Sequence, residues 1–190
     1  MTQLILASGS PYRRELLQRL GIPFRVVVAD VDESDSGDES GASLASRLGA
    51  AKARAVADDF PEALVIGSDQ VAECAGRLLG KPGSIERARE HLAFCSGREI
   101  IFHSSVAVIR GQRQAQALVP TRVRLRRLSD DQIADYVERD QPLDCAGAMR
   151  SEALGIALAE SISSDDPSAL IGLPLIATVT LLTGFGVKIP

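Results

Sequence analysis

Short apolar segments alternate with segments of helical periodicity along the first half of the chain, and this alternation constrains the fold more than any other feature. The runs at residues 3–6 and 63–73 have the length and composition of buried strands. Between them, residues 43–58 repeat apolar side chains at helical spacing. The expected buried stripe comprises Leu44, Leu48, Ala51 and Ala55. Strands that alternate with helices indicate an α/β sheet.

The second half of the chain adds longer strands to this pattern. Residues 99–109 and 117–128 predict two strands that turn near Gly111 as a hairpin. Long strands after alternating elements favour a mixed sheet, which we expect within a single domain over residues 1–190. The other expected elements are strands at residues 24–28, within 76–84 and near 155–161, and helices from Pro11 to Gly21, from Ser84, from Ser129 through Tyr136 and from about Pro174.

Composition excludes several classes of protein. With 45% hydrophobic and 24% charged residues among 190, the chain has the balance of a soluble globular protein. Its net charge of −4 gives no general attraction to nucleic acid or to an anionic membrane, so neither is an expected partner. No apolar run is long enough to span a bilayer, and no secretory signal precedes the first strand. We therefore expect a soluble cytoplasmic protein.

The cysteines and histidines do not indicate redox or zinc chemistry. Cys74, Cys95 and Cys145 are far apart in the sequence and form no CxxC pair, which argues against a disulfide framework and fits a reducing cytosol. His91 and His103 lack the spacing of metal ligands, so each is expected to be structural.

The stretch "LILASGSPYRRELLQRLG" reads as a strand, a turn of small residues and a helix that Ser10 can cap. Such a helix start presents unpaired backbone N–H groups and the positive end of the helix dipole. Arg13 and Arg14 in the first turn oppose that dipole, and a bound anion would remove the conflict. The Ser8 hydroxyl could add a donor to the same anion. By itself, the stretch fits a capped surface helix with solvated arginines better than an anion site.

Charged residues elsewhere could complete such a site. Asp69 follows an apolar run, so we expect its carboxylate at or just before the end of a buried strand, where it could bind Mg²⁺ or accept a proton from water. Lys52 lies on an otherwise apolar helix, and Lys81 lies in a rigid "GKP" loop. Asp32 and Glu33 could supply oxygen ligands to a metal. Each of these residues, taken alone, is more often a solvated or loop-capping side chain.

Considered together, these side chains favour one kind of chemistry. Arginines and lysines neutralise phosphates and carboxylates bind hard cations. Cleavage of a phosphate ester or a phosphoanhydride, in which positioning and charge neutralisation supply most of the catalysis, fits this set. The sequence contains neither GxxxxGK[ST] nor GxGxxG, so it is neither a P-loop nor a Rossmann protein.

The order of the motifs resembles the Maf-like nucleotide pyrophosphatases across essentially the whole chain. The segments that carry this resemblance are "LILASGSPYRRELLQRLG", "VDE" at residues 31–33, "AAKA", "VIGSDQV", "GKP", "CAGAMRSEALGIAL" and "LIGLPL". The resemblance implies an elongated, two-lobed α/β fold around a mixed sheet, with a nucleotide cleft between the lobes, similar to the inosine triphosphate pyrophosphatases. It also implies cleavage of nucleoside triphosphates to monophosphate and pyrophosphate, with Mg²⁺ or Mn²⁺, by a homodimer.

The family's functional residues can be carried over onto matching positions. Asp69 resembles the catalytic acid that accepts a proton from water, and Glu33 resembles a metal-binding or catalytic carboxylate. The metal would then lie between Asp69 and Glu33. The groups that the resemblance expects to bind phosphate are Ser8, Arg13, Lys52 and Lys81, with the two lysines also counted as catalytic. Arg14 is expected to bind substrate because of its place in the first turn of the helix.

Two positions depart from the commonest family pattern. Many members have a basic residue at the position of Tyr12 and a threonine at the position of Gln70. Together with Glu152 in "SEALG", these residues resemble the members that act on 7-methyl-GTP. A methyl group at N7 makes guanine cationic, and a cation gains from the aromatic face of Tyr12. Glu152 could pair with that charge, and Gln70 could hydrogen-bond an edge of the base.

The residues leave two other functions open. The same chemistry could act on dTTP or UTP. Alternatively, the pocket could bind a nucleotide without turnover, as in a nucleotide-sensing regulator of cell division.

Overall fold

The computed structural model describes residues 3–34, 37 and 39–189. Strands and helices alternate in the first half of the chain, as expected, and long strands follow. In chain order the elements are β1 (Leu4–Leu6), α1 (Pro11–Gln18), β2 (Arg25–Val26), α2 (Gly41–Ala57), β3 (Leu64–Cys74), β4 (Arg77–Leu79), α3 (Ile85–Cys95), β5 (Glu99–Arg110), β6 (Arg113–Leu125), α4 (Asp130–Asp140), 3₁₀ turns at Ala146–Ala148 and Leu154–Leu158, β7 (Ala159–Ser163), a 3₁₀ turn at Ala169–Ile171, and α5 (Leu175–Gly184).

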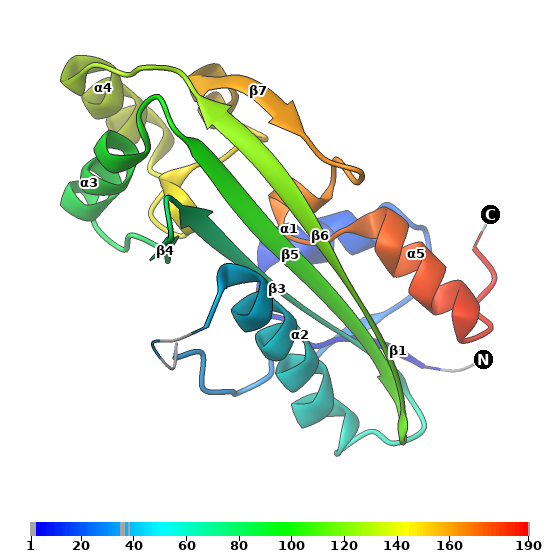
Figure 1. Cartoon of the computed structure of the whole chain (residues 1–190). Coiled ribbons are helices and arrows are strands. Elements are labelled where there is room, and N and C mark those ends of the chain that lie inside the picture. The colour runs from blue at the N-terminus through cyan, green and yellow to red at the C-terminus, as the bar shows by residue number, and fades with distance from the viewer. Residues whose placement is uncertain (1–2, 35–36, 38, 190) are drawn as a thin grey trace.

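A mixed sheet joins the two ends of the molecule. Its strand order is β2-β1-β3-β5-β6-β7, and β4 pairs with the far end of β3. The pairs of β1 with β2 and β3 are parallel, whereas β3, β5, β6 and β7 pair in antiparallel order. The long strands β5 and β6 run from the lobe that contains α3 and α4 to the lobe that contains α1, α2 and α5 (Figure 1). The expected two-lobed α/β fold around a mixed sheet is therefore confirmed.

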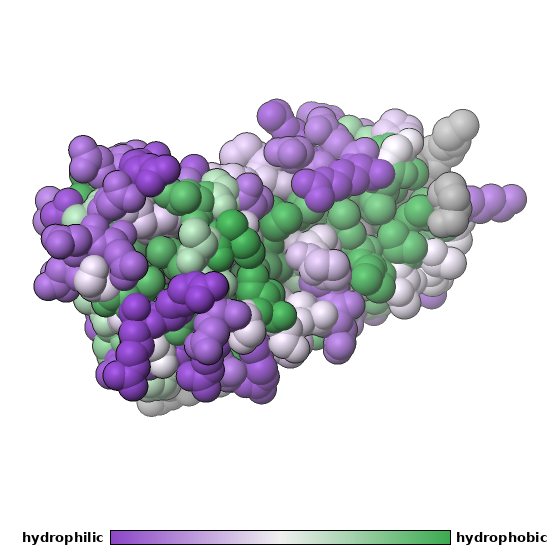
Figure 2. Space-filling view, turned by 90° about the horizontal axis from the view of Figure 1, so that it is seen from above, coloured by the Kyte–Doolittle hydropathy of each residue, from purple (hydrophilic) through white to green (hydrophobic). Residues whose placement is uncertain are grey.

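The side chains of β3 alternate between two cores, one on each face of the sheet, and the other lobe has a separate core. Val65 packs with α2 on one face of the sheet, whereas its neighbour Ile66 packs with α1 and α5 on the other. In the other lobe, Phe102 of β5 packs against α3 and α4. The molecule is longer than it is wide, and hydrophilic side chains gather at the end seen on the left of Figure 2. Among the described helices, none is long and apolar enough to cross a membrane.

Helix α2 lies directly on β3 because two glycines face each other there. A Cβ atom on Gly67 would overlap the carbonyl oxygen of Gly49 and the amide nitrogen of Ala53. A Cβ atom on Gly49 would overlap the hydroxyl of Ser105 in the neighbouring strand. This close approach brings the next turn of α2, which carries Lys52, over the middle of β3.

The predicted stripe of α2 was wrong at two positions. The helix begins at Gly41 and is turned toward the sheet through Gly49. Ala55 is therefore exposed and Ala51 is only half-buried, while Lys52 is buried. Alanine and glycine differ little in polarity, so their pattern did not reveal which face meets the sheet.

Other elements differ from expectation mainly at their ends. β2 covers only Arg25–Val26 of the expected residues 24–28. Most of the strand expected near 155–161 is instead a 3₁₀ turn, because Gly155 packs against the backbone of Arg150. The hairpin turn at Gly111 is confirmed. In the acidic loop, residues 35, 36 and 38 lie outside the described part of the chain.

Candidate active site

Asp69 lies in the middle of β3, and the expectation that it would stand at the end of a strand was wrong. On one edge β3 pairs continuously with β5, and Asp69 faces Ser105 in that register. On the other edge β3 pairs with β1 as far as Ile66 and with β4 from Ala72 onward. Within the described residues no strand pairs with that edge between these two points. The carboxylate of Asp69 therefore lies where one edge of β3 has no neighbouring strand. Strands are usually shorter than β3, so the sequence did not suggest that the strand continues past Asp69 to Cys74.

Lys52 joins two acids from different parts of the chain. Its ammonium nitrogen lies 2.6 Å from Oδ1 of Asp69 and 2.6 Å from Oε1 of Glu33. The Lys52 and Asp69 side chains are only 9% and 10% exposed, whereas Glu33 is 57% exposed. A buried lysine needs such partners, because an unpaired charge away from water is costly.

Arg13 approaches the same acid from α1, which packs on the opposite face of the sheet from α2. Its Nε donates to the carbonyl of Gly172 (2.9 Å), and its Nη1 lies 3.5 Å from the hydroxyl of Ser8. Its Nη2 is 3.8 Å from Oδ1 of Asp69. Burial lowers the pKa of the Arg13 guanidinium, and the charges of Asp69 and Glu33 act in the opposite direction. Arg13 is therefore held in place with one edge directed at the acid.

The cations also act on Glu33. Burial raises the pKa of its carboxyl, but the hydrogen bond from Lys52 and the charges of Lys52, Lys81 and Arg13 outweigh it and hold that pKa below its usual value. Glu33 is thus an anion at neutral pH. Lys81 is exposed, lines the cavity and has no ion-pair partner among the described residues.

The expected site residues converge on two adjoining cavities between the lobes. One cavity, of about 340 Å³, contains most of them. The second, of about 520 Å³, shares Arg13, Glu33, Lys52, Gln70 and Lys81 with the first and adds Asp69. The expected site residues that line the first cavity are Ser8, Tyr12, Arg13, Glu33, Lys52, Gln70, Lys81 and Glu152.

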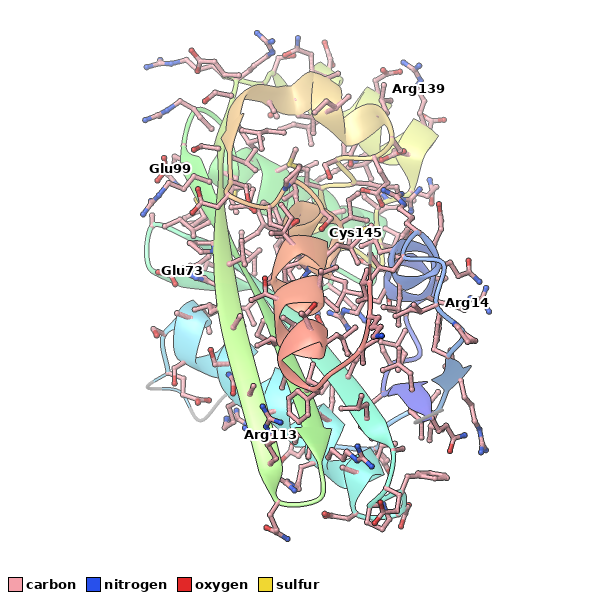
Figure 3. The ribbon with its side chains drawn as sticks, turned by 90° about the vertical axis from the view of Figure 1, so that its right-hand side faces the viewer. Arg14, Glu73, Glu99, Arg113, Arg139 and Cys145 are labelled. Atoms are coloured by element: carbon pink, nitrogen blue, oxygen red, sulfur yellow. The ribbon has the colours of Figure 1, made fainter. Side chains whose placement is uncertain are left out.

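Arg14 is the expected site residue that the structure does not bring to the cavity. It is exposed, lines neither cavity and points away from the Cys145 side of α1 (Figure 3). Adjacent helical residues face different directions, so Arg13 and Arg14 cannot both turn toward Asp69.

Tyr12, Asp144 and Glu152 line the first cavity but not the second, so they define an acidic part of the cleft away from Asp69. The Tyr12 hydroxyl donates to Asp144, with distances of 3.2 and 3.5 Å to its two carboxylate oxygens. Burial, together with the nearby Cys145 and Asp144, raises the pKa of Tyr12 to about 12. Tyr12 is therefore protonated and able to donate at physiological pH.

Gln70 is positioned by the protein itself. Its amide nitrogen donates to the Ser104 hydroxyl (3.0 Å) and to the carbonyls of Ala169 and Leu170 (both 2.9 Å). With its N–H groups engaged, only its oxygen remains for an edge of a bound base.

Sequence reasoning missed Asp144, Arg150 and Gly172. Asp144 and Gly172 contact site residues more than a hundred positions away, so no local pattern could have identified them. The one available signal was position, since Asp144 directly precedes the "CAGAMR" segment and Gly172 lies within "LIGLPL".

The fold and the site together define a two-lobed α/β protein with a cleft lined by cationic and acidic side chains. Residues 3–185 match the family described as Maf-like protein, and the chain belongs to this family. A relative from Polaromonas sp. JS666 is 52% identical over 98% of this chain and 86% of its own length. Relatives from Aromatoleum aromaticum and Xanthomonas axonopodis pv. citri are each 50% identical over 100% of this chain and over 98% and 100% of their own lengths. All three are named 7-methyl-GTP pyrophosphatase.

A solved structure shares the fold at low identity. A HAM1 protein from Coxiella burnetii matches with a TM-score of 0.53 and 17% identity, over 97% of this chain and 100% of its own. The likeness supports the two-lobed architecture and nothing finer.

Proposed function

We propose that this protein hydrolyses 7-methyl-GTP to 7-methyl-GMP and pyrophosphate. The observation that carries the proposal is the convergence of Arg13, Lys52 and Lys81, from three separate segments, on the cavity beside Asp69. Like charges repel one another, so three cations at one cleft indicate a polyanionic ligand. The names of the relatives supply the identity of the nucleotide.

Asp69 supplies the base in this proposal. Its Oδ1 is engaged by Lys52 and approached by Arg13, whereas Oδ2 makes no hydrogen bond with any described residue. Oδ2 accepts a proton from a water whose oxygen forms a new bond to the α-phosphorus. The bond from that phosphorus to the α–β bridging oxygen breaks, and pyrophosphate leaves with its charge neutralised by the lysines and Arg13.

The donor set fits a divalent metal. Glu33 and Asp69 present hard carboxylate oxygens that already share one cation, and Mg²⁺ is commonly held by one or two carboxylates together with substrate phosphates. Among the described residues no three acids, histidines or cysteines form a metal-binding group, so phosphate oxygens and water would complete the coordination. When bound, Mg²⁺ or Mn²⁺ would withdraw charge from the phosphates.

The other end of the cavity suits a cationic base. The ring of Tyr12 offers a π face, and Glu152 adds a carboxylate. A neutral pyrimidine, as in dTTP or UTP, would gain less from both groups.

A substrate panel tests the proposal. Wild-type protein is incubated with 7-methyl-GTP, GTP, dTTP and UTP at equal concentration, with Mg²⁺ or Mn²⁺, and pyrophosphate and phosphate are measured separately. We expect pyrophosphate, metal dependence and the fastest turnover with 7-methyl-GTP. Faster turnover of dTTP or UTP would favour the pyrimidine alternative, phosphate alone would mean a different bond is broken, and tight binding without product would favour a regulator.

Assembly and location belong to the same proposal. We expect a homodimer in the cytoplasm, as in the family. Light scattering of the purified protein would give the mass of two chains, and the mass of one chain would contradict the dimer.

A further inference from the structure

Asp144 lies in a hydrogen-bonded network that crosses the cleft. Tyr12 reaches it from α1, and the two residues are 132 positions apart in the chain. Arg150 fixes its other side, with Nη2 at 3.5 Å from Oδ1 of Asp144. Asp144 is 57% exposed and lines the cavity, so its carboxylate is open to the cavity as well as to its protein partners.

The network leaves this end of the cavity negatively charged. Arg150 is shared, since its Nη1 also donates to the carbonyl of Asp140 (3.1 Å) and lies 3.8 Å from the Asp140 carboxylate. One guanidinium therefore faces the carboxylates of Asp140 and Asp144, while Glu152 adds another acid to the lining. Where the second cavity adjoins the first, three cations outnumber Asp69 and Glu33, and neither Asp144 nor Glu152 lines that second cavity.

We infer that Asp144 is a specificity-determining residue that selects a base carrying positive charge, both by its own carboxylate and by positioning the ring of Tyr12. The inference rests on the proposed function and extends it to a residue that holds no phosphate. It predicts a substrate that is anionic at one end and cationic at the other, which matches the charge distribution of the cleft.

Two physical effects support this role. A carboxylate beside a cationic ring contributes directly through Coulomb attraction, which is only partly screened in a cleft. In addition, a phenol that donates to an anion is polarised, and the extra electron density strengthens the attraction of its ring for a cation. Both effects vanish for a neutral base of the same shape.

Asp144→Asn is the informative variant. An asparagine oxygen can still accept from Tyr12 and the side chain keeps its size, so mainly the charge is removed. The matched control is Asp59→Asn, which removes an exposed carboxylate in the turn after α2 that lines neither cavity. Tyr12→Phe keeps the ring and removes the hydroxyl, and it tests the same contact should Asp144→Asn fail to fold.

The measurement is the ratio of the dissociation constants of GMP and 7-methyl-GMP, obtained by calorimetry. We expect wild type and Asp59→Asn to prefer the methylated nucleotide equally. In Asp144→Asn the ratio of the two dissociation constants should be smaller by about fivefold. Tyr12→Phe should lose part of it. An unchanged ratio, a parallel loss of both affinities or a wild type without preference would each overturn the inference.

Binding and turnover separate this inference from the proposed function. Nucleoside monophosphates need no hydrolysis, so the ratio is decisive even for a protein that releases no pyrophosphate. If 7-methyl-GTP released no pyrophosphate, the proposed function would be contradicted. The ratio of dissociation constants would still test the role of Asp144.

Discussion

The ammonium nitrogen of Lys52 is 2.6 Å from the carboxylate of Asp69, although the two residues belong to a helix and a strand that cross at a pair of glycines. The same nitrogen contacts Glu33 from the acidic loop. One buried cation therefore ties three segments together at the centre of the cleft. The contacts of Lys52 therefore bear on both the stability of the fold and the activity of the site.

Asp69→Asn should preserve the fold and nearly abolish turnover. The amide keeps the shape and can still accept from Lys52, but it cannot take a proton from water. We expect kcat for pyrophosphate release to fall by roughly 100- to 10,000-fold, the contribution of a positioned base. Circular dichroism would verify the fold, and a rate within a few-fold of wild type would exclude Asp69 as the base.

Lys52→Met should weaken both stability and substrate binding. Methionine fills the same volume but leaves Asp69 beside a second acid with no shared cation. We expect a loss of about 2–4 kcal/mol in the free energy of unfolding, since breaking one side of a buried pair is costly, together with a raised KM. Chemical denaturation and steady-state kinetics measure the two effects. Unchanged stability would show that the pair is dispensable for folding.

Gly67→Ala should be strongly destabilising. Its methyl group would overlap the backbone of α2, so the helix must move off the sheet and carry Lys52 with it. We expect a loss on the order of 3 kcal/mol, which lowers the thermal midpoint by about 6–12 °C. Gly76→Ala is a comparison without overlap, because nothing lies within 4 Å of its added Cβ and only its positive φ is strained. Equal midpoints for the two variants would contradict the close approach.

Asp166→Ala should disturb the wall of the cleft from a distance. The buried Asp166 carboxylate accepts from the backbone amide of Ile176 (2.7 Å) at the start of α5 and from that of Ser168 (3.1 Å). It thereby shapes the loop whose Gly172 carbonyl holds Arg13. We expect a stability loss of about 1–3 kcal/mol and a raised KM. A normal KM in a folded, destabilised variant would show that Asp166 caps the start of α5 without affecting the cleft.

The titration of Tyr12 gives a prediction in pH. Its pKa is raised to about 12, so its hydrogen bond to Asp144 is complete below the usual tyrosine value of about 10 and is lost as the pH rises toward 12. The difference in tyrosinate absorbance between wild type and Tyr12→Phe isolates this group. Asp144→Ala should lower the midpoint, because it removes a negative charge and an acceptor. A midpoint near 10 in wild type would contradict the hydrogen bond between Tyr12 and Asp144.

Local features of the fold were predictable because they depend on neighbours in sequence. Ser10 caps α1 by accepting from the amide of Arg13, and Ser129 and Gln132 form a reciprocal capping box at α4. The hairpin at Gly111 follows from the same kind of short-range chemistry. Each depends on contacts within a few residues, so the sequence specifies it before any core exists.

The candidate site was predictable in its residue types but not in its arrangement. Lysine on an apolar helix and an acid after an apolar run indicated charged chemistry, and both residues meet in the cleft. That Asp69 lies in mid-strand depends on where β1 stops pairing and β4 begins, which no pattern within β3 encodes.

The sequence by itself determined the alternation of strands and helices, the caps and turns, and the supply of arginines, lysines and acids. The tertiary structure alone decided that Arg13 faces the cleft while Arg14 does not, and that Tyr12 meets Asp144. The physical reason is range: periodicity and capping act over a few residues, whereas the direction of a side chain in a cleft depends on which distant surfaces pack against its backbone.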